Sequence, residues 1–289
     1  MFGNITTINS NFSAMEALYN LKQTNGKMGF HQTRLSTGKR INSAEDDAAG
    51  YHIAKHLESR TRGLSQALDN VSTAKNVLNI AEGGYQAQMD ILQQIKEDLT
   101  QAADGALSEE QRFAIGDRVN SLLTEFNDIY TQTKYNGFQL FAEDDSDREM
   151  TFQVGEESGD TFTVTFDASN RGDVGESDTA INLDDIASGD WGALDQEQAT
   201  AGIDTLENAI DSLSATIQRM GDYQARLTSK EESLSIGVAN TEASRSRIED
   251  ADFAKEQMEM VKLQILQQTG VSAFSQANSA PQVVLSLFK

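Results

Sequence analysis

Residues 203–227 read IDTLENAIDSLSATIQRMGDYQARL, and their apolar side chains recur at alternating steps of three and four residues. This spacing is typical of a helix that packs along its whole length against another helix. The repeat keeps its register to Ile248 and then slips by one residue. A slip in a long helical seam commonly marks a change of partner, so we expect an internal boundary near residue 250.

The N-terminal half carries a matching pattern, with one apolar stripe from Leu57 to Leu99 and a second, offset stripe beside it. Two stripes predict one helix over about residues 44–103 that is buried on two faces. Asp104-Gly105 ends the pattern, and residues 108–111 predict a capping box that starts a shorter helix. The residues that we expect to pack this helical rod are Leu64, Leu68, Val71, Leu78, Met89, Leu92, Ile115, Val119, Leu122, Phe126, Ile203, Leu206, Ile210, Leu213, Ile217 and Leu227.

The composition agrees with long helices and excludes several classes of function. The one proline among 289 residues is Pro281, so the strongest helix breaker is absent before that point. We therefore predict a mainly α protein, an elongated antiparallel helical bundle or coiled coil formed by both halves of the chain. The net charge of −22 argues against nucleic acid as a partner, and no apolar run is long enough for membrane insertion. The absence of cysteine excludes disulfides and a thiol nucleophile.

The middle of the chain, residues 143–198, has a different character. Residues 161–166 alternate in the manner of a β-strand and residues 150–154 do so more weakly, which predicts a small β-hairpin. Seventeen acidic residues against two arginines give residues 143–197 a net charge of −15, whereas residues 1–42 carry +4. We expect this acidic excursion to face solvent.

No candidate catalytic or cofactor site emerges from the sequence. His52 and His56 have the i,i+4 spacing that can hold a metal ion on a helix, but the glutamate of a zinc-protease motif is missing between them. Residues 36–40 depart at both ends from the phosphate-binding loop that they partly match. We predict no enzymatic activity, no cofactor and no metal site, and interpret the two histidines as facing solvent.

Several stretches resemble the conserved ends of bacterial flagellins. At the N-terminal end these are residues 33–50, TRLSTGKRINSAEDDAAG, residues 62–67, RGLSQA, and residues 135–140, YNGFQL. At the C-terminal end they are residues 248–256, IEDADFAKE, and residues 276–285, QANSAPQVVL. The resemblance covers about residues 1–142 and 200–289, with the motifs in the correct order.

The resemblance implies a structural protein that self-assembles into the extracellular helical filament of the bacterial flagellum for swimming motility. It implies a terminal coiled-coil segment of residues 1–42 and 254–289 in the inner tube of the filament, and a helical rod of residues 43–142 and 199–253. It also implies secretion through the flagellar type III export gate with an export chaperone, and contacts with filament cap and hook-junction proteins. The residues expected in the terminal self-assembly seams are Ile5, Ile8, Phe12, Met15, Leu18, Met258, Val261, Ile265, Val284, Leu285 and Phe288.

Two questions stay open at the level of the sequence. We expect the terminal segments to be disordered in a monomer and to fold on assembly, because alone they bury little apolar surface. The alternative is that they already pair within one chain. A hook–filament junction protein of the same architecture and a soluble coiled-coil binding module also remain as alternative functions.

The resemblance also bears on innate immunity. In many flagellins, receptor recognition relies on an arginine and a leucine of the long N-terminal rod helix and on a glutamate of the shorter helix. The matching positions here hold Gln94, Asp98 and Arg118, so all three depart from the family pattern. We therefore expect a poor innate-receptor ligand.

Overall fold

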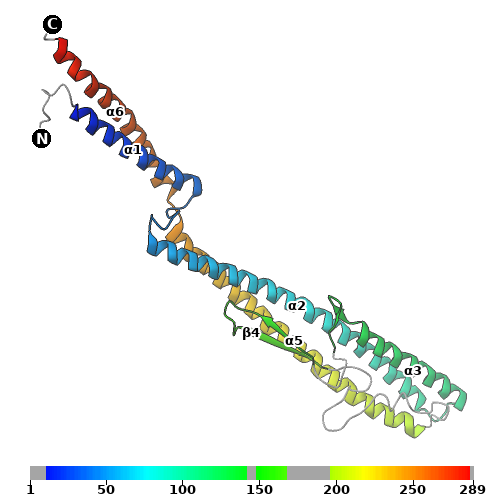
Figure 1. The fold of residues 1–289 in the computed structure, drawn as a ribbon. Coiled ribbons are helices and arrows are strands. Elements are labelled where there is room, and N and C mark those ends of the chain that lie inside the picture. Colours follow the sequence, from blue (N-terminus) through cyan, green and yellow to red (C-terminus); the bar gives the residue numbers. More distant parts are fainter. Residues whose placement is uncertain (1–10, 142–147, 168–195, 287–289) are drawn as a thin grey trace. The chain divides into compact units, whose positions relative to one another are not determined.

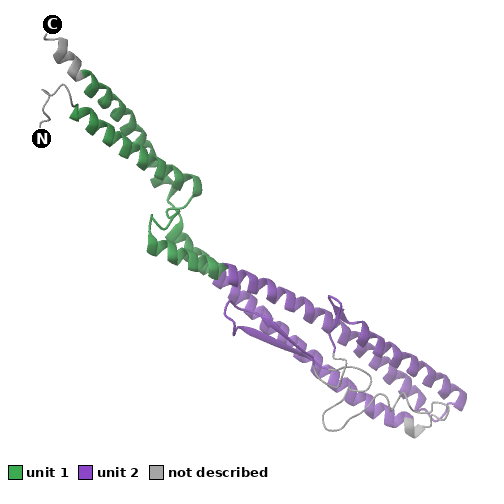
Figure 2. Ribbon diagram, viewed as in Figure 1, with its two compact units in different colours: residues 1–61, 239–289 green, residues 62–238 purple. Residues whose placement is uncertain are grey.

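The computed structural model describes residues 11–141, 148–167 and 196–286, and within them the chain is mainly helical, as the sequence predicts (Figure 1). The helices are α1 (Phe12–Thr37), α2 (Ala48–Ala102), α3 (Glu109–Gln132), α5 (Gln196–Glu249) and α6 (Phe253–Ser286). The strands are β1 (Lys134–Tyr135), β2 (Phe138–Gln139), β3 (Arg148–Gln153) and β4 (Thr161–Phe166). Figure 2 shows the two compact units of the chain, residues 1–61 with 239–289 and residues 62–238. The division passes through α2 and α5.

The unit of residues 62–238 is built on α2 and α5, which run antiparallel. Lys75 Nζ lies 2.8 Å from Glu231 Oε2, and Lys96 Nζ lies 2.7 Å from Glu207 Oε1, so residue numbers rise along one helix as they fall along the other. All sixteen residues predicted to pack the rod lie in or against one apolar core, which α3 shares. Nine of them are buried and seven are partly buried against those nine and their neighbours.

The predicted ends and turns of this unit are confirmed. The Ser108 side chain accepts a hydrogen bond from the Gln111 backbone N–H, and the Gln111 side chain accepts one from the Ser108 N–H, which closes the capping box of α3. Asn136 and Gly137 form the turn between β1 and β2, with φ of 49° and 83°. Such positive angles favour asparagine and glycine, which is why the Asn-Gly pair predicts the turn.

The helix α2 continues unbroken through Gly83 and Gly84. A methyl group added at Gly84 would lie 2.8 Å from Thr133 Oγ1 and 3.0 Å from Phe141 Cζ, whereas nothing lies within 4 Å of one added at Gly83. The second glycine therefore allows the chain beyond α3 to approach α2 closely.

The strands β3 and β4 form the predicted hairpin, but the expectation that the acidic excursion faces solvent is wrong for one face of it. Phe162, Val164 and Phe166 are buried in the rod core. The Tyr223 ring of α5 meets the Phe162 ring edge-on at 5.8 Å between centroids, and the Arg226 guanidinium lies 4.7 Å from the centre of the same ring. Because side chains alternate between the faces of a strand, a segment with a high net charge can still carry an apolar face. The prediction for residues 168–195 lies outside the described residues.

In the unit of residues 1–61 and 239–289, α1 and α6 lie side by side and antiparallel (Figure 1). The Asn11 side chain caps α1 by accepting from the Ala14 N–H, and its amide donates to the Ala277 carbonyl of α6 at 2.8 Å. Further along the pair, the Gln267 amide donates to Asn25 Oδ1 at 2.8 Å. This arrangement is the alternative of pairing within one chain, and it replaces the expectation of disordered ends for the described parts of α1 and α6.

The segments that follow α1 and precede α6 are hydrogen-bonded to each other. The Arg40 N–H donates to the Glu249 carbonyl at 2.6 Å, and the Ala251 N–H donates to the Gly38 carbonyl at 2.8 Å. Lys39 Nζ also donates to Glu249 Oε1 at 2.6 Å. The break between α5 and α6, after Glu249 and before Phe253, lies where the sequence predicts an internal boundary near residue 250. The compact unit contains both connecting segments, the first turns of α2 and the last turns of α5, because it comprises residues 1–61 and 239–289. It is therefore longer than the terminal segment predicted as residues 1–42 and 254–289.

Candidate self-assembly surface

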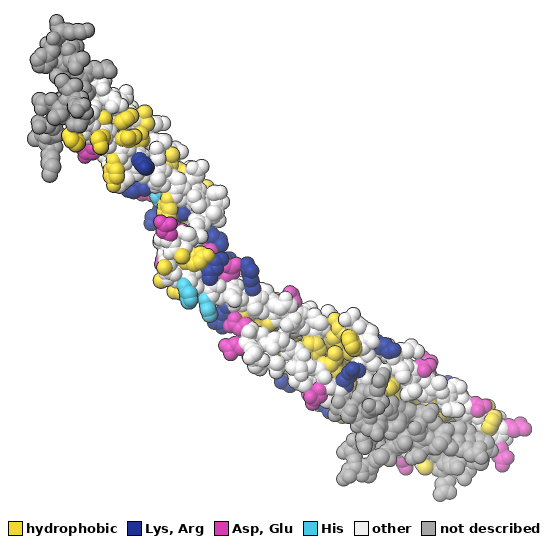
Figure 3. All heavy atoms as spheres, in the orientation of Figure 1, with side chains coloured by type: hydrophobic (Ala, Val, Ile, Leu, Met, Phe, Trp, Pro, Cys, Tyr) yellow, Lys and Arg dark blue, Asp and Glu magenta, His cyan; other side chains and the backbone are white. Residues whose placement is uncertain are grey.

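Large apolar side chains are exposed along both α1 and α6. Figure 3 shows such side chains gathered on this part of the surface. Six of the residues predicted for the terminal seams have described side chains, and all six are exposed. Val261 is 46% exposed, and the other five are at least 50% exposed: Phe12, Met15, Leu18, Met258 and Ile265. The other exposed large apolar residues of the two helices are Tyr19, which is next to Leu18 in the same N-terminal stripe, and Phe30, Phe253, Leu266 and Val271, which the prediction did not include. We call these eleven side chains the apolar face of the terminal pair.

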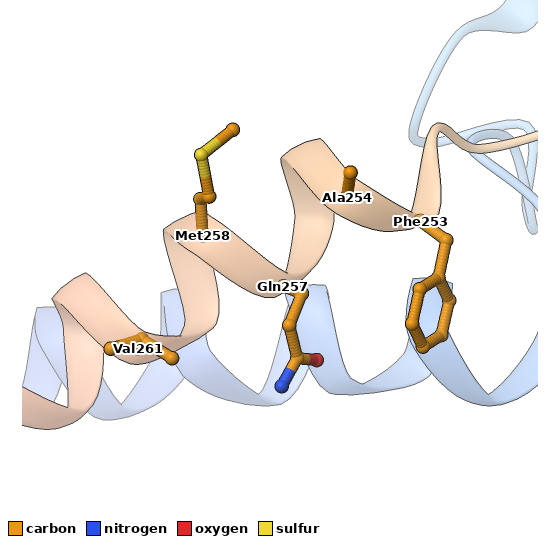
Figure 4. Close-up of a pocket in the computed structure, with 5 residues that line it drawn as sticks. All are labelled: Phe253, Ala254, Gln257, Met258 and Val261. Atoms are coloured by element: carbon orange, nitrogen blue, oxygen red, sulfur yellow. The ribbon is translucent and has the colours of Figure 1, made fainter.

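A shallow groove of about 440 Å³ lies on α6 within this face. Its lining residues are Phe253, Ala254, Gln257, Met258 and Val261. In Figure 4, Phe253 and Gln257 point to one side of the helix, and Ala254 and Met258 point to the other. All five belong to one helix, so the groove has one wall in this chain and is open to a second surface.

The apolar face is accompanied by a low density of charge. Residues 263–286, the greater part of α6, contain no Asp, Glu, Lys, Arg or His. Interfaces between proteins are depleted of charged residues at their centres, because each charge that loses water must find a partner. This segment has the composition of a surface that becomes buried.

One carboxylate stands out in the contact between α1 and α6. Glu256 is 6% exposed, its Oε2 lies 2.5 Å from His31 Nδ1, and its Oε1 lies 3.2 Å from Arg34 Nη1. Burial alone would raise the pKa of Glu256, but the hydrogen bonds and charges of His31 and Arg34 outweigh it and hold the pKa below its usual range. The group is therefore a charged, paired carboxylate between the two helices.

The other predicted seam residues are not described. Ile5, Ile8 and Phe288 lie outside the described residues, as do the side chains of Val284 and Leu285. Their part in self-assembly stays a prediction. Of the missed apolar residues, Leu266 and Val271 lie in the uncharged stretch of residues 263–286, and this lack of charge was the signal that could have found them. Phe253 lies among Asp252, Lys255 and Glu256, so charge density gave no such signal there.

The three positions that depart from the receptor pattern lie on α2 and α3. Gln94 is exposed, whereas Asp98 is 4% exposed and its Oδ2 lies 3.1 Å from Arg118 Nε. Two of the departures are therefore in contact with each other. Burial raises the pKa of Asp98, and Arg118 offsets only part of this effect. The opposite signs of the two residues were the only indication of this contact in the sequence.

The two histidines of α2 have no third potential ligand beside them among the residues that the structure describes. His52 and His56 are both exposed, and no group of three potential ligand side chains occurs among the residues that the structure describes. None of the helices within residues 11–132 and 196–286 has an apolar segment long enough to cross a bilayer.

Comparison with solved structures shows which known fold the chain resembles. The chain is similar to a putative flagellar hook-associated protein from Vibrio parahaemolyticus, with a TM-score of 0.62 over 71% of this chain and 100% of that one. The two sequences are 14% identical, so this likeness concerns the fold alone.

Sequence comparison gives the family. Residues 8–146 match the bacterial flagellin N-terminal helical region, and residues 203–288 match the bacterial flagellin C-terminal helical region. The chain is 34% identical over 295 residues to the flagellar filament 33 kDa core protein of Treponema phagedenis, which covers 98% of this chain and 99% of that protein. It is 31% identical over 282 residues to a flagellin of Halalkalibacterium halodurans, again over 98% and 99% of the two chains. The chain belongs to the bacterial flagellin family.

Proposed function

We propose that the apolar face of the terminal pair is the surface through which this flagellin packs against copies of itself in the flagellar filament. The observation that carries the proposal is the exposure of eleven large apolar side chains on two helices that hold few charges. Exposed apolar side chains in this number on two paired helices are typical of a surface that binds a partner. Burial of each side chain would contribute about 25 cal/mol per Å² of apolar area removed from water.

The family supports a second copy as the occupant of this surface. Flagellins are structural proteins of a filament, and a filament presents every subunit with the same neighbours many times. The groove of Phe253, Met258 and Val261 is then a site for an apolar side chain of the next subunit. We further propose that the finished filament is extracellular and that the chain reaches it through the type III export gate with an export chaperone. The filament cap and hook-junction proteins are the other expected partners.

Paired substitutions on α6 test the surface. Met258→Glu with Ile265→Glu places two charges in the apolar face, where a neighbouring subunit would have to desolvate them. We expect the doubly substituted monomer to keep its helix content and to lose sedimentable filaments. Gln101→Glu introduces the same residue type at an exposed position of α2 and should leave the filament yield unchanged. Filaments of the double variant with normal yield and length would refute the proposed surface.

A truncation tests the role of the C-terminal segment as a whole. Removal of residues 254–289 should abolish filaments and leave the core of residues 62–238 folded, because that core lies in the other compact unit. Circular dichroism and negative-stain electron microscopy report the two properties separately. Normal polymerisation of the truncated chain would contradict the role assigned to this segment.

Abundance separates the filament subunit from a hook–filament junction protein of the same fold. The subunit should be the main protein of filaments sheared from cells, whereas a junction protein would be rare in them. The third alternative, a soluble coiled-coil binding module, predicts that the protein stays a small oligomer at every concentration. Sedimentation of concentrated protein distinguishes it from a subunit, which should form micrometre-long filaments.

We also propose that the chain is a poor ligand of the innate receptor that senses many flagellins. The contact of Asp98 with Arg118 supports this, because the leucine and glutamate of the family pattern are both replaced by charges that engage each other. The triple variant Gln94→Arg, Asp98→Leu and Arg118→Glu restores the pattern and should gain signalling in a reporter-cell assay. Strong signalling by the unmodified monomer would refute the proposal.

A further inference from the structure

The contact between α1 and α6 is made largely by small and apolar residues. Ala14 of α1 is buried, as are Met260 and Leu263 of α6, and Gly270 approaches Leu21 Cδ1 so that a methyl group there would lie 3.4 Å away. Apolar side chains such as Met260 and Leu263 can exchange neighbours when one helix slides along the other, and alanine and glycine set no position of their own. Packing of this kind holds helices together but defines their register poorly.

Glu256 is the buried charged residue in this contact, and each of its two oxygens is occupied by a different residue of α1. The other polar contacts named above, Asn25 with Gln267 and Asn11 with the Ala277 carbonyl, join uncharged groups. His31 Nδ1 contacts Oε2 and Arg34 Nη1 contacts Oε1. The Phe30 ring covers the Arg34 guanidinium at 4.0 Å and meets the His31 ring edge-on at 5.6 Å between centroids. The two partners are thus held in place by their own helix.

A displacement of the helices by one heptad would break this arrangement. Residues 24 and 27 would replace His31 and Arg34, so that Thr24 and Lys27 would face the carboxylate. In the opposite direction the replacements are Gly38 and Ile41, which follow the end of α1. A buried carboxylate that loses one or both charged partners costs several kcal/mol in general, so slipped registers are disfavoured.

We infer that Glu256, through its contacts with His31 and Arg34, sets the register in which α1 and α6 pair. We also infer that this register aligns the exposed apolar side chains of the two helices for assembly. The first statement concerns one chain. The second rests on the proposed self-assembly surface. Glu256 is in this sense a positioning residue for assembly, as a single polar residue is in many coiled coils.

The absence of cysteine from the chain makes the register measurable by disulfide cross-linking. Asn25→Cys with Gln267→Cys reports the observed register, because these two side chains are in hydrogen-bonding contact. Asn25→Cys with Val271→Cys reports a slip of one turn, and Asn25→Cys with Phe274→Cys reports a slip of one heptad. A disulfide requires Cα atoms within about 7 Å, so each pair reads one register.

The variant to test in these backgrounds is Glu256→Leu, which keeps an apolar contact and removes the carboxylate. We expect the ratio of slipped to observed cross-links to rise at least about tenfold. Gln264→Leu is the control, since it also introduces leucine at an exposed position of α6 outside the groove and should leave the ratio unchanged. Glu256→Gln keeps one acceptor without the charge and should give an intermediate ratio.

Two results would overturn the inference. Glu256→Leu with only the observed cross-link would show that packing alone sets the register. Loss of every cross-link with full helix content would show that Glu256 is needed for pairing and has no part in choosing the register. Sedimentation of the same variants without the introduced cysteines tests assembly separately. A shifted register with normal filaments would support the role of Glu256 in register and overturn the statement that this register aligns the apolar face, whereas the variant with Met258→Glu and Ile265→Glu tests the surface itself.

Discussion

Gly83 and Gly84 are neighbours in α2 whose surroundings differ completely. Gly83 is exposed, and added atoms there would meet open space. At Gly84 the nearest atoms belong to Thr133, whose hydroxyl donates to the Ile129 carbonyl at 2.7 Å and is therefore fixed. The sequence shows two equivalent interruptions of a helix, and the structure makes one of them a packing requirement.

Alanine at each glycine should have opposite effects on the unfolding free energy. Gly83→Ala should raise it by up to about 1 kcal/mol, the usual difference in helix propensity. Gly84→Ala should lower it, because overpacking costs about 1–3 kcal/mol and exceeds the propensity gain. Urea unfolding followed by circular dichroism measures both, and equal shifts in the two variants would contradict the close approach at Gly84.

Asp98 is a buried carboxylate whose partner, Arg118, has a side chain that is 64% exposed. Because burial raises its pKa, the folded chain binds the Asp98 proton more tightly than the unfolded chain does. Its contribution to stability therefore declines as the pH rises through the raised pKa. At neutral pH the charge is a cost of folding that Arg118 only partly offsets.

Asp98→Leu should therefore stabilise the rod. We expect the unfolding free energy at pH 7 to rise by about 1 kcal/mol, since an apolar residue often replaces a buried charge favourably when the partner can be solvated. The gain should shrink as the pH falls and Asp98 of the parent chain takes up its proton. Asp90→Leu, at an exposed position of the same helix, is the control and should change little. A less stable Asp98→Leu protein would contradict this account.

At the scale of elements, the β3–β4 hairpin is attached to the helices by its buried face and by its ends. The Asn70 amide of α2 donates to the Gln153 carbonyl at 3.0 Å. At the other end, the Thr216 hydroxyl of α5 donates to Asp167 Oδ2 at 2.8 Å, and Arg219 pairs with the same carboxylate. The hairpin is therefore part of the rod.

Substitutions on the two faces of β4 should separate packing from strand propensity. Val164→Thr places a hydroxyl in the core and should lower the unfolding free energy by about 1–3 kcal/mol. Thr163→Val makes the reverse change at an exposed position, where the hydroxyl lies 3.2 Å from that of Thr151, and should be nearly neutral. Thermal unfolding measures both, and equal destabilisation would mean that the hairpin does not pack on the helices.

The elements themselves are largely predictable, because each depends on signals that are local in the sequence. The heptad spacing predicts α2 and α5, the Ser108 capping box predicts the start of α3, and Asn136-Gly137 predicts a turn. Which faces meet depends on distant residues. Alternation in β4 could not reveal that α5 supplies Tyr223 and Arg226 to cover Phe162.

The candidate site was predictable to the same extent and for the same reason. Apolar spacing identified Met258 and Ile265, but it could not distinguish the face of α6 that meets α1 from the face that stays exposed. The contact of Glu256 with His31 joins residues 225 positions apart, and although Glu256 ends the motif of residues 248–256, nothing in the sequence marks His31 as its partner. Such a pair becomes visible only when the two helices are placed together.

At the scale of the whole molecule, the charge of −22 is unevenly distributed along the chain. Residues 143–197 carry −15 and residues 1–42 carry +4. In a filament the acidic segments of many subunits would repel one another unless salt screens them. The screening length falls from about 30 Å at 0.01 M salt to about 8 Å at 0.15 M.

Polymerisation should therefore improve with salt. We expect the protein concentration needed for filaments, measured by sedimentation and negative-stain microscopy, to fall as sodium chloride rises from about 0.01 M to 0.15 M. A variant with Asp184→Asn, Asp185→Asn and Asp190→Asn has three fewer negative charges and should depend less on salt. An unchanged salt dependence in this variant would place the repulsion elsewhere in the chain.

The bonds between the connecting segments have a mechanical consequence. The segment after α1 and the segment before α6 are cross-tied by Arg40 to Glu249 and by Ala251 to Gly38. A pulling force applied to one connecting segment is passed to the other through these hydrogen bonds, so the two backbone segments share the load. The ties run across the direction of such a pull and would have to shear together before one connector could extend by itself. A load on this part of the chain would therefore be carried by two hydrogen-bonded backbone segments instead of one.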